Sequence, residues 1–382
     1  MEESAKGFRL FNVKECFSEE EVNRKRVPEI DIARGLAVLF MVICHVFLAL
    51  NVKYDTLGVL VDDILGGPFS APVFMFLMGI GMAYSRHTDA KSTFIRGLKL
   101  LAIAYILNFV RLTIPSLIAY GISGDHSFIA DWLDKLMCVD ILQFAGMAFL
   151  VIALFKKLKL DWWWLLLFSV ALLVVGPFLK DKATNIHWLD LFLALFYKTY
   201  YYAYFPLFHW LILPVVGLKV GELYLHLKNK ARFYVFTLVV IFPISAAFEV
   251  VAYMVGFELL GVATEYYYFT LLSGVSLCGF VMAWISLIGL VLMLFKNPHL
   301  GFFTLLSKNV LSIYCIHWVI VFFMHNLFAL YWQYDEMPEW QWALFSIGVL
   351  AASIGLSIVY TRVKQSLSWS KGKRLPNSRF ER

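Results

Sequence analysis

The stretch "IDIARGLAVLFMVICHVFLAL", residues 30–50, has the length and apolar character of a helix that crosses a membrane. It nevertheless contains an arginine, Arg34, and a histidine, His45. An ionisable side chain within the bilayer is costly unless it faces a protein partner or a cavity. The stretch therefore predicts a transmembrane helix whose two polar residues face the interior of a helix bundle.

The composition of the whole chain is typical of a membrane protein. Of its 382 residues, 61% are hydrophobic and 16% are charged, whereas about a quarter are charged in an ordinary soluble domain. Since about 20 apolar residues cross the hydrocarbon, we expect an all-α, polytopic bundle of about ten transmembrane helices. The expected spans are 30–52, 68–85, 94–120, 137–155, 162–179, 205–226, 233–257, 269–295, 304–328 and 340–360. Residues 189–196 are too short to cross alone and predict an interfacial or re-entrant piece.

The basic residues predict the orientation. Ten spans would place 25 of the 33 Lys and Arg residues on one side of the membrane and five on the other. Cytoplasmic loops collect these residues, so we expect both termini in the cytoplasm and the protein in the cell membrane. The expected parts are a cytoplasmic segment 1–29, one transmembrane domain 30–362 and a basic cytoplasmic tail 363–382. The net charge of +6 is then a topology signal, and we expect no nucleic-acid partner.

The first 29 residues contain no apolar run of signal-peptide length, so the first span is expected to direct insertion. The five cysteines show no CxxC or paired spacing, and packing is their expected role. No histidine pair has the spacing and acid of a metal-binding helix, and we expect no metal.

Arg34 and His45 are eleven residues apart, about three helical turns. Their side chains therefore share one face, about 16.5 Å apart. That distance suits a long substrate better than an ion pair, and Asp31 is the expected partner of Arg34 because it lies one turn away. The alternative is that Arg34 anchors the helix at the phosphate level and His45 is a hydrogen-bonded core residue.

Further polar residues lie within or beside other spans. Asp140 and Gln143 share a face at about the depth of His45, where a carboxylate would orient an imidazole; a helix-start acid bound to the dipole is an equal alternative. For Arg111, which lies near Asn108, interhelical bonding is one expected role. The remaining candidates are His209 near the outer side, His317 near mid-membrane, and Glu249, to which no role is assigned.

Prolines and glycines are found in the second span. Pro68 and Pro72 are expected to break its helix and leave backbone groups along a cavity. Gly79 and Gly81 are expected to permit close helix contact. The tyrosine-rich run "YKTYYYAYF", residues 197–205, is expected to form an interfacial belt, although a sugar site would use the same rings.

The motif "RGLAVLFMVICH" resembles the arginine, ten residues and histidine found in the first span of the acyltransferase-3-like superfamily of membrane acyltransferases. The longer "IDIARGLAVLFMVICH", with "PVFMFLMGIGMAYS" and "VDILQFAGMAFL", is more similar still to the heparan-alpha-glucosaminide N-acetyltransferase branch and its bacterial relatives. The late "SKNVLSIYCIH" is similar to the motif GxxSxxIYxxH, with Ser307 in place of the glycine and Val310 in place of the serine.

This resemblance implies transfer of an acyl group, expected to be acetyl, from cytosolic acyl-CoA to a carbohydrate hydroxyl or amine at the outer side. His45 would act as general base or nucleophile, with Asp140 orienting it and Gln143 or a tyrosine donating to the oxyanion. Arg34 would meet the donor phosphates. Substrate binding is also expected at Asp31, Arg111, His209 and His317. Besides the bilayer, acyl-CoA and a glycan, a further copy of the chain is a possible partner.

A different class of function is a transporter or flippase whose buried charges line a path, since such charges serve that purpose too. The chain shows no internal repeat, which disfavours this alternative. A non-catalytic membrane scaffold explains the fewest of the buried polar residues.

Overall fold

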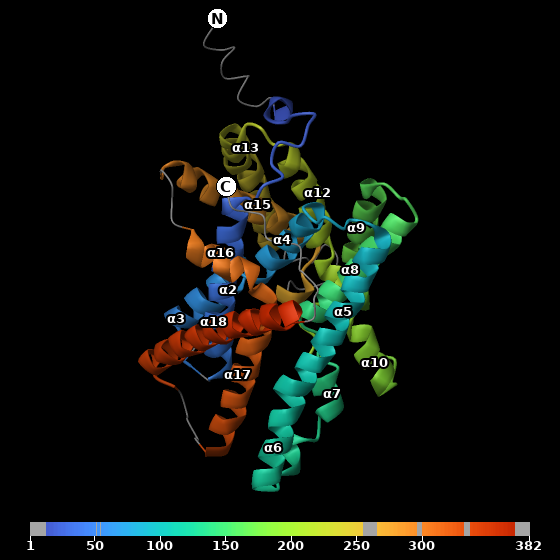
Figure 1. Cartoon of the computed structure of the whole chain (residues 1–382). Coiled ribbons are helices and arrows are strands. Elements are labelled where there is room, and N and C mark those ends of the chain that lie inside the picture. Colours follow the sequence, from blue (N-terminus) through green and yellow to red (C-terminus); the bar gives the residue numbers. More distant parts are fainter. Residues whose placement is uncertain are drawn as a thin grey trace, which may run out of the picture.

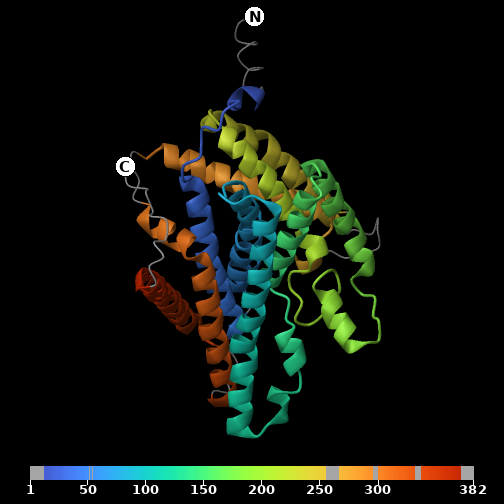
Figure 2. The same ribbon diagram turned by 45° about the vertical axis from the view of Figure 1, so that its right-hand side comes forward.

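The computed structural model describes residues 13–50, 52–53, 55–254, 266–295, 300–331 and 337–370. Within these residues the regular structure is helical, and the extended pairings are isolated bridges. The all-α prediction is thereby confirmed. Parts of the expected segments 1–29, 233–257 and 363–382 lie outside the described residues. Most helices run roughly side by side as a bundle (Figures 1 and 2).

Among the described residues, eight helical segments are long and apolar enough to cross a membrane, or nine if a pair bent by 75° forms one span. The protein is thus a multi-pass membrane protein. The eight are Pro28–Ala49 (α2), Thr56–Ala83 (α3, η2 and α4), Ala90–Ser123 (α5, η3 and α6), Trp162–Leu179 (α9), Leu207–His226 (α11 and α12), Lys230–Met254 (α13, η5 and α14), Leu271–Met293 (α15) and Glu339–Leu367, most of α18. The bent pair is α16, Gly301–Lys308, followed by α17, Val310–Tyr331.

The expected span 137–155 is not among these segments. It forms a 17-residue helix, α8, Ile141–Lys157, which packs along α5. The expected short piece at 189–196 forms the eight-residue helix α10, His187–Ala194. Several spans are built from consecutive pieces: Thr56–Gly58 (α3), Val59–Gly66 (η2), Ala71–Ala83 (α4), Ala90–Asn108 (α5), Phe109–Thr113 (η3), Ile114–Ser123 (α6), Leu207–Trp210 (α11), Ile212–His226 (α12), Lys230–Phe236 (α13), Thr237–Ile241 (η5) and Phe242–Met254 (α14). The remaining elements are Val13–Cys16 (η1), His126–Phe128 (η4), Trp132–Leu136 (α7), Tyr266–Tyr268 (η6) and Glu339–Ser370 (α18).

Helix α2 is the centre of the bundle, because η2, α4, α15, α16, α17 and α18 all pack against it. Pro28 occupies its first turn, where a missing backbone N–H costs nothing. From Gly35 onward it carries no Lys, Arg, Asp or Glu, so its neighbours can surround it with apolar side chains. In Figure 1, α18 runs obliquely across the front of this region. His45 is consequently held on a helix enclosed by protein.

The second span is broken at Pro68 as expected, whereas Pro72 lies in the first turn of α4 and does not break that helix. The π-helix η2 ends at Gly66, and α4 begins after a turn at residues 67–70 that contains Pro68. The hydroxyl of Tyr266 donates to the carbonyl of Gly67 at 2.9 Å. A backbone group freed by the break is therefore satisfied by a side chain from another part of the chain.

Helices α4 and α12 approach each other through glycines. A Cβ atom added to Gly79 would lie 2.2 Å from the carbonyl oxygen of Pro214, and one added to Gly217 would lie 2.1 Å from that of Phe76. Close contact through Gly79 is thus confirmed. At Gly81 the expectation is wrong, because its nearest neighbour would be the guanidinium of Arg34 at 3.9 Å.

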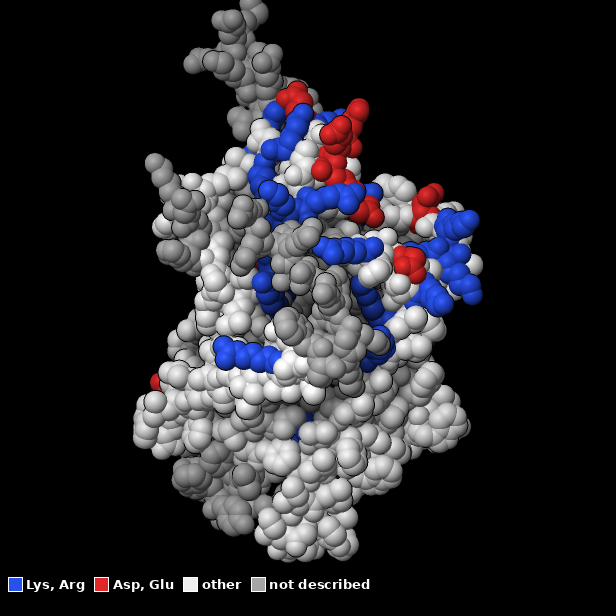
Figure 3. All heavy atoms as spheres, viewed as in Figure 1, with Lys and Arg blue, Asp and Glu red and all other residues white. Residues whose placement is uncertain are grey.

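The charges are unevenly distributed along the bundle. On the face shown in Figure 3, Lys and Arg gather toward the upper end, and the lower end is almost free of them. Such an asymmetry is typical of a protein whose two ends lie on opposite sides of a membrane.

We predict that Gly217→Ala destabilises the protein by about 1–3 kcal/mol, because backbone atoms of α4 occupy the space that the new methyl group needs. The measurement is the free energy of unfolding in detergent. Gly121→Ala is the matched control, since a Cβ there meets nothing within 4 Å. Equal effects of the two substitutions would show that the α4–α12 approach is not tight.

Candidate active site

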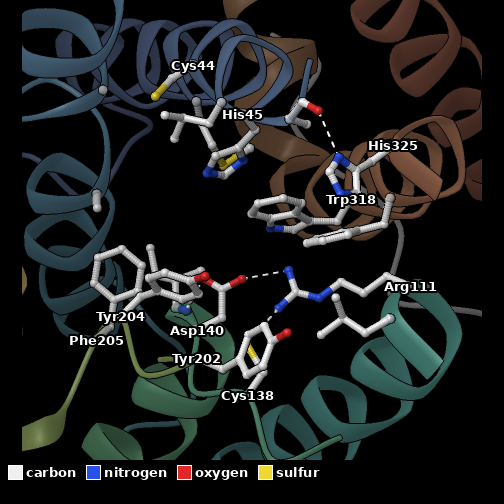
Figure 4. A pocket seen from close by; sticks show the side chains of 18 of the residues that line it. Cys44, His45, Arg111, Cys138, Asp140, Tyr202, Tyr204, Phe205, Trp318 and His325 are labelled. Carbon is white, nitrogen blue, oxygen red and sulfur yellow. Dashed lines mark hydrogen bonds and ion pairs between the residues drawn. The ribbon is translucent and has the colours of Figure 1, made fainter. Parts of the chain in front are cut away.

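A cavity of about 680 Å³ lies in the half of the bundle that contains the C-terminal end of α2. Its walls come from α2, the break between η2 and α4, η3, the segment 201–205, η6 and α17. Residues far apart in the sequence therefore meet here (Figure 4). The polar residues in its lining include His45, Asp62, Arg111 and Asp140.

His45 enters the cavity from α2 and is held by two residues of α17. Its Nδ1 lies 2.9 Å from Nε2 of His317, and its ring stacks on the indole of Trp318 with centroids 3.9 Å apart. His317 is fully buried, and its own Nδ1 lies 3.1 Å from the carbonyl oxygen of Ile313. With Nδ1 engaged, the ring nitrogen of His45 left for a bound molecule is Nε2.

Arg111 lies in the π-helical turn η3 and is buried, with 1% of its surface exposed. Its Nη1 donates to Oδ2 of Asp140 at 2.7 Å, and its Nη2 donates to Oδ1 of Asn108 at 3.0 Å. Its guanidinium also lies 4.7 Å from the ring centre of Trp318, a cation–π distance. The interhelical role expected for Arg111 is therefore confirmed. Figure 4 shows Trp318 between His45 and Arg111.

Asp140 caps helix α8. Its Oδ1 accepts from the backbone N–H of Ile141 at 2.7 Å, and its own N–H donates to Oε1 of Gln143 at 3.1 Å, completing a capping box. Its other oxygen pairs with Arg111. The expected contact between Asp140 and His45 is thus replaced by an ion pair, because a guanidinium buried this deeply requires a carboxylate partner. The side-chain carbonyl of Gln143 accepts the hydrogen bond of the cap, and Gln143 lies outside the cavity lining.

Arg34 belongs to a separate polar network nearer the other end of α2. It donates to Oγ of Ser307 at 3.3 Å and to the carbonyl of Leu77 at 3.4 Å. Ser307 donates in turn to Asp31 at 2.7 Å. The partner expected for Arg34 is wrong, since the carboxylate of Asp31 forms its ion pair with Arg26 and reaches Arg34 only through Ser307.

The cavity does not extend along α2 as far as Arg34. On α2 its lining ends at Met41, seven residues or about 10 Å from Arg34. The shared helix face expected of Arg34 and His45 therefore carries two distinct environments. Only the His45 end opens into the cavity.

His209 lies apart from this cavity. It is fully buried on α11, where its Nδ1 lies 2.9 Å from the carbonyl oxygen of Phe269. Its ring packs on α9, since a Cβ added to Gly176 would lie 2.9 Å from its Nε2. The structure thus brings together His45, His317, Arg111 and Asp140, but not His209.

Sequence reasoning missed two groups in the lining. Trp318 follows His317 directly, and only its contacts reveal that it separates His45 from Arg111. The other group belongs to the tyrosine-rich segment, for which an interfacial belt was the first expectation and a sugar site the alternative; its Tyr202 and Tyr204 reach the cavity. Tyr202 donates to Asp131 at 2.5 Å, and burial together with this bond raises the pKa of the Tyr202 hydroxyl.

The arrangement offers a basic nitrogen to a molecule in a partly apolar cavity, with a fixed guanidinium–carboxylate pair close by. Such a nitrogen can accept a proton or attack a carbonyl. Among the described residues, no group of three or more His, Cys, Asp or Glu side chains gathers as a metal site would require.

We predict that Asp140→Asn destabilises the protein by about 3–5 kcal/mol, because it leaves the buried guanidinium of Arg111 without its counter-ion. Asparagine is itself a good helix cap, so the loss reports the ion pair. The measurement is the free energy of unfolding in detergent. Glu222→Gln, in a half-exposed pair with Lys219, is the control and should cost no more than about 1 kcal/mol. A loss no larger than the control's would contradict a structural role for the buried pair.

Comparison with known proteins identifies the family of the chain. Residues 26–256 match the family model described as heparan-alpha-glucosaminide N-acetyltransferase, catalytic. No curated protein matches the chain. The matched region is more than half of the sequence and includes His45, Arg111 and Asp140, whereas His317 and Trp318 follow it. Members of this family are membrane acetyltransferases that use acetyl-CoA as donor. The chain belongs to the heparan-alpha-glucosaminide N-acetyltransferase family.

Proposed function

We propose that this acetyltransferase moves an acetyl group from cytosolic acetyl-CoA to an amine or hydroxyl of a carbohydrate at the extracytoplasmic side, and that the reaction takes place at His45. The observation that carries the proposal is the imidazole of His45 in a large cavity, with Nδ1 engaged and Nε2 left for a substrate. The family name makes a glucosamine-type amine the first acceptor to test.

Two routes are open to Nε2 of His45. As a general base it takes the proton of the acceptor while the acceptor nitrogen or oxygen attacks the thioester carbonyl, and coenzyme A leaves as the thiol. As a nucleophile it first takes the acetyl group and then passes it to the acceptor. Both routes end with the same acetylated product and free coenzyme A.

The lining of the cavity suits a carbohydrate acceptor. Tyr202, Tyr204 and Phe205 supply rings on one side, and the flat faces of such rings pack against the apolar faces of sugars. Asp62 and Asp63 lie in the same lining and can accept hydrogen bonds from hydroxyl or ammonium groups. In this proposal the acceptor occupies the aromatic end, and the acetyl group arrives at His45.

The donor has to pass the level of Arg34 to reach His45 from the cytoplasm. We assign the donor phosphates to Arg34 and the basic residues beyond it, because a guanidinium binds phosphate oxygens well. The network of Asp31, Ser307 and Arg34 occupies this level and would rearrange as the pantetheine arm enters. Asp31 and Arg34 thereby keep the donor-binding role expected of them.

The same proposal includes ten spans with both termini in the cytoplasm of a cell-membrane protein, α8 being the tenth. Its support is the concentration of Lys and Arg at one end of the bundle (Figure 3). Segments 1–29 and 363–382 then flank the acyltransferase domain, 30–362, on the cytoplasmic side. A transporter would use buried charges to line a path, whereas Arg111 and Asp140 neutralise each other.

We predict that His45→Ala lowers acetyl transfer by at least about 10²–10⁴-fold, because it removes the base or nucleophile. The measurement is transfer of labelled acetyl from acetyl-CoA to glucosamine, followed by mass spectrometry. His87→Ala, at an exposed position between α4 and α5, is the control and should keep full activity. Full transfer by the His45 variant would disprove this catalytic assignment. Acetylated His45 in protein incubated without acceptor would select the nucleophilic route.

The orientation predicts opposite labelling of two exposed positions. Cysteine introduced at Lys157, on the basic end of α8, should react with an impermeant maleimide only when the cytoplasmic side is accessible. Cysteine introduced at Tyr201, which is 82% exposed, should react from outside in intact cells. The reverse pattern would overturn the orientation, and with it the direction of acetyl transfer.

A further inference from the structure

The contact between His45 and His317 restricts where protons can sit. Nδ1 of His317 lies 3.1 Å from the carbonyl oxygen of Ile313, one helical turn earlier on α17. A carbonyl oxygen only accepts hydrogen bonds, so Nδ1 of His317 has to carry a proton. In a neutral imidazole the other nitrogen then holds a lone pair. Nε2 of His317 is therefore an acceptor.

The neutral form of His317 follows from its surroundings. The imidazole is fully buried beneath Tyr314 and Trp318. The guanidinium of Arg111 lies over the indole of Trp318, and its charge is neutralised by Asp140. Since Asp140 is already paired with Arg111, a charged His317 would add an uncompensated cation, which is costly in such a place.

The acceptor on His317 determines the tautomer of His45. Nδ1 of His45 lies 2.9 Å from Nε2 of His317, so it has to be the donor and carry the proton. Nε2 of His45 is then unprotonated. The stack on Trp318, with ring centroids 3.9 Å apart, fixes the plane of the His45 ring. A ring turned over within that plane would place Cδ2 where Nδ1 now lies and would lose the hydrogen bond to His317.

We propose that His317 is a positioning residue that holds His45 in the tautomer whose Nε2 is free to accept a proton or an acetyl group. The chain of hydrogen bonds runs from Nδ1 of His45 to Nε2 of His317, and from Nδ1 of His317 to the Ile313 carbonyl. His317 thus takes the place that a carboxylate has in a catalytic triad, because Asp140 is occupied by Arg111. The catalytic consequence rests on the function proposed for His45, but the tautomer itself does not.

The first test is the protonation of His45 in the wild-type protein. The full chain labelled with ¹⁵N-histidine in lipid bilayers is studied by solid-state NMR, and the His45 signals are identified by their loss in His45→Gln. We expect a proton on Nδ1 and none on Nε2. A proton on Nε2 overturns the inference, whatever the activity of the protein. A proton on Nδ1 in a protein that transfers no acetyl group would refute the proposed function and leave the positioning role intact.

The second test compares two amides at position 317. In His317→Gln the amide oxygen can reach the place of Nε2 and accept from His45, whereas the shorter side chain of His317→Asn reaches only the place of Nδ1. We expect the Gln variant to keep acetyl transfer within about tenfold and the Asn variant to lose about 10²–10⁴-fold, as when a triad histidine adopts the wrong tautomer. The His45 signals should show Nδ1–H in the Gln variant alone.

Equal transfer by the two folded variants would overturn the positioning role. Folding is checked by the unfolding midpoint and by size-exclusion chromatography. If neither variant folds, the wild-type NMR measurement still decides the question.

Discussion

The ion pair between Arg111 and Asp140 is the interaction on which the site depends. A guanidinium with 1% of its surface exposed cannot lie among membrane helices without a carboxylate, and Asp140 supplies it from the N-cap of α8, one residue before the helix begins. Arg111 also lies against Trp318. One buried cation thus ties η3, α8 and α17 together, and the indole that it packs against supports His45 on its other face.

This constraint explains why a second imidazole, rather than a carboxylate, contacts His45. Asp140 has one oxygen in the helix cap and the other on Arg111, and these two bonds hold its carboxylate toward α8 and η3. His317 supplies an uncharged acceptor instead. A neutral pair suits a cavity enclosed by apolar helices, because no second charge needs solvation.

Several features were predictable from local patterns. Apolar length predicted the helices, Pro68 predicted the break before α4, and the spacing of Arg34 and His45 placed both on one face of α2. The partner of Asp31, the place of His209 and the role of Trp318 were not predictable. Each depends on which helix lies opposite, and several apolar helices of similar length can exchange neighbours without changing any local pattern.

The sequence by itself determined that this chain is a multi-pass helical membrane protein of an acetyltransferase family, because hydrophobic length and short motifs are local properties. Only the tertiary structure decided that His45 meets His317 across 272 positions of sequence, that Asp140 turns to Arg111, and that the cavity ends before Arg34. The physical reason is that hydrogen bonds act over about 3 Å, so the packing of α2 against α17 settles which polar groups can bond.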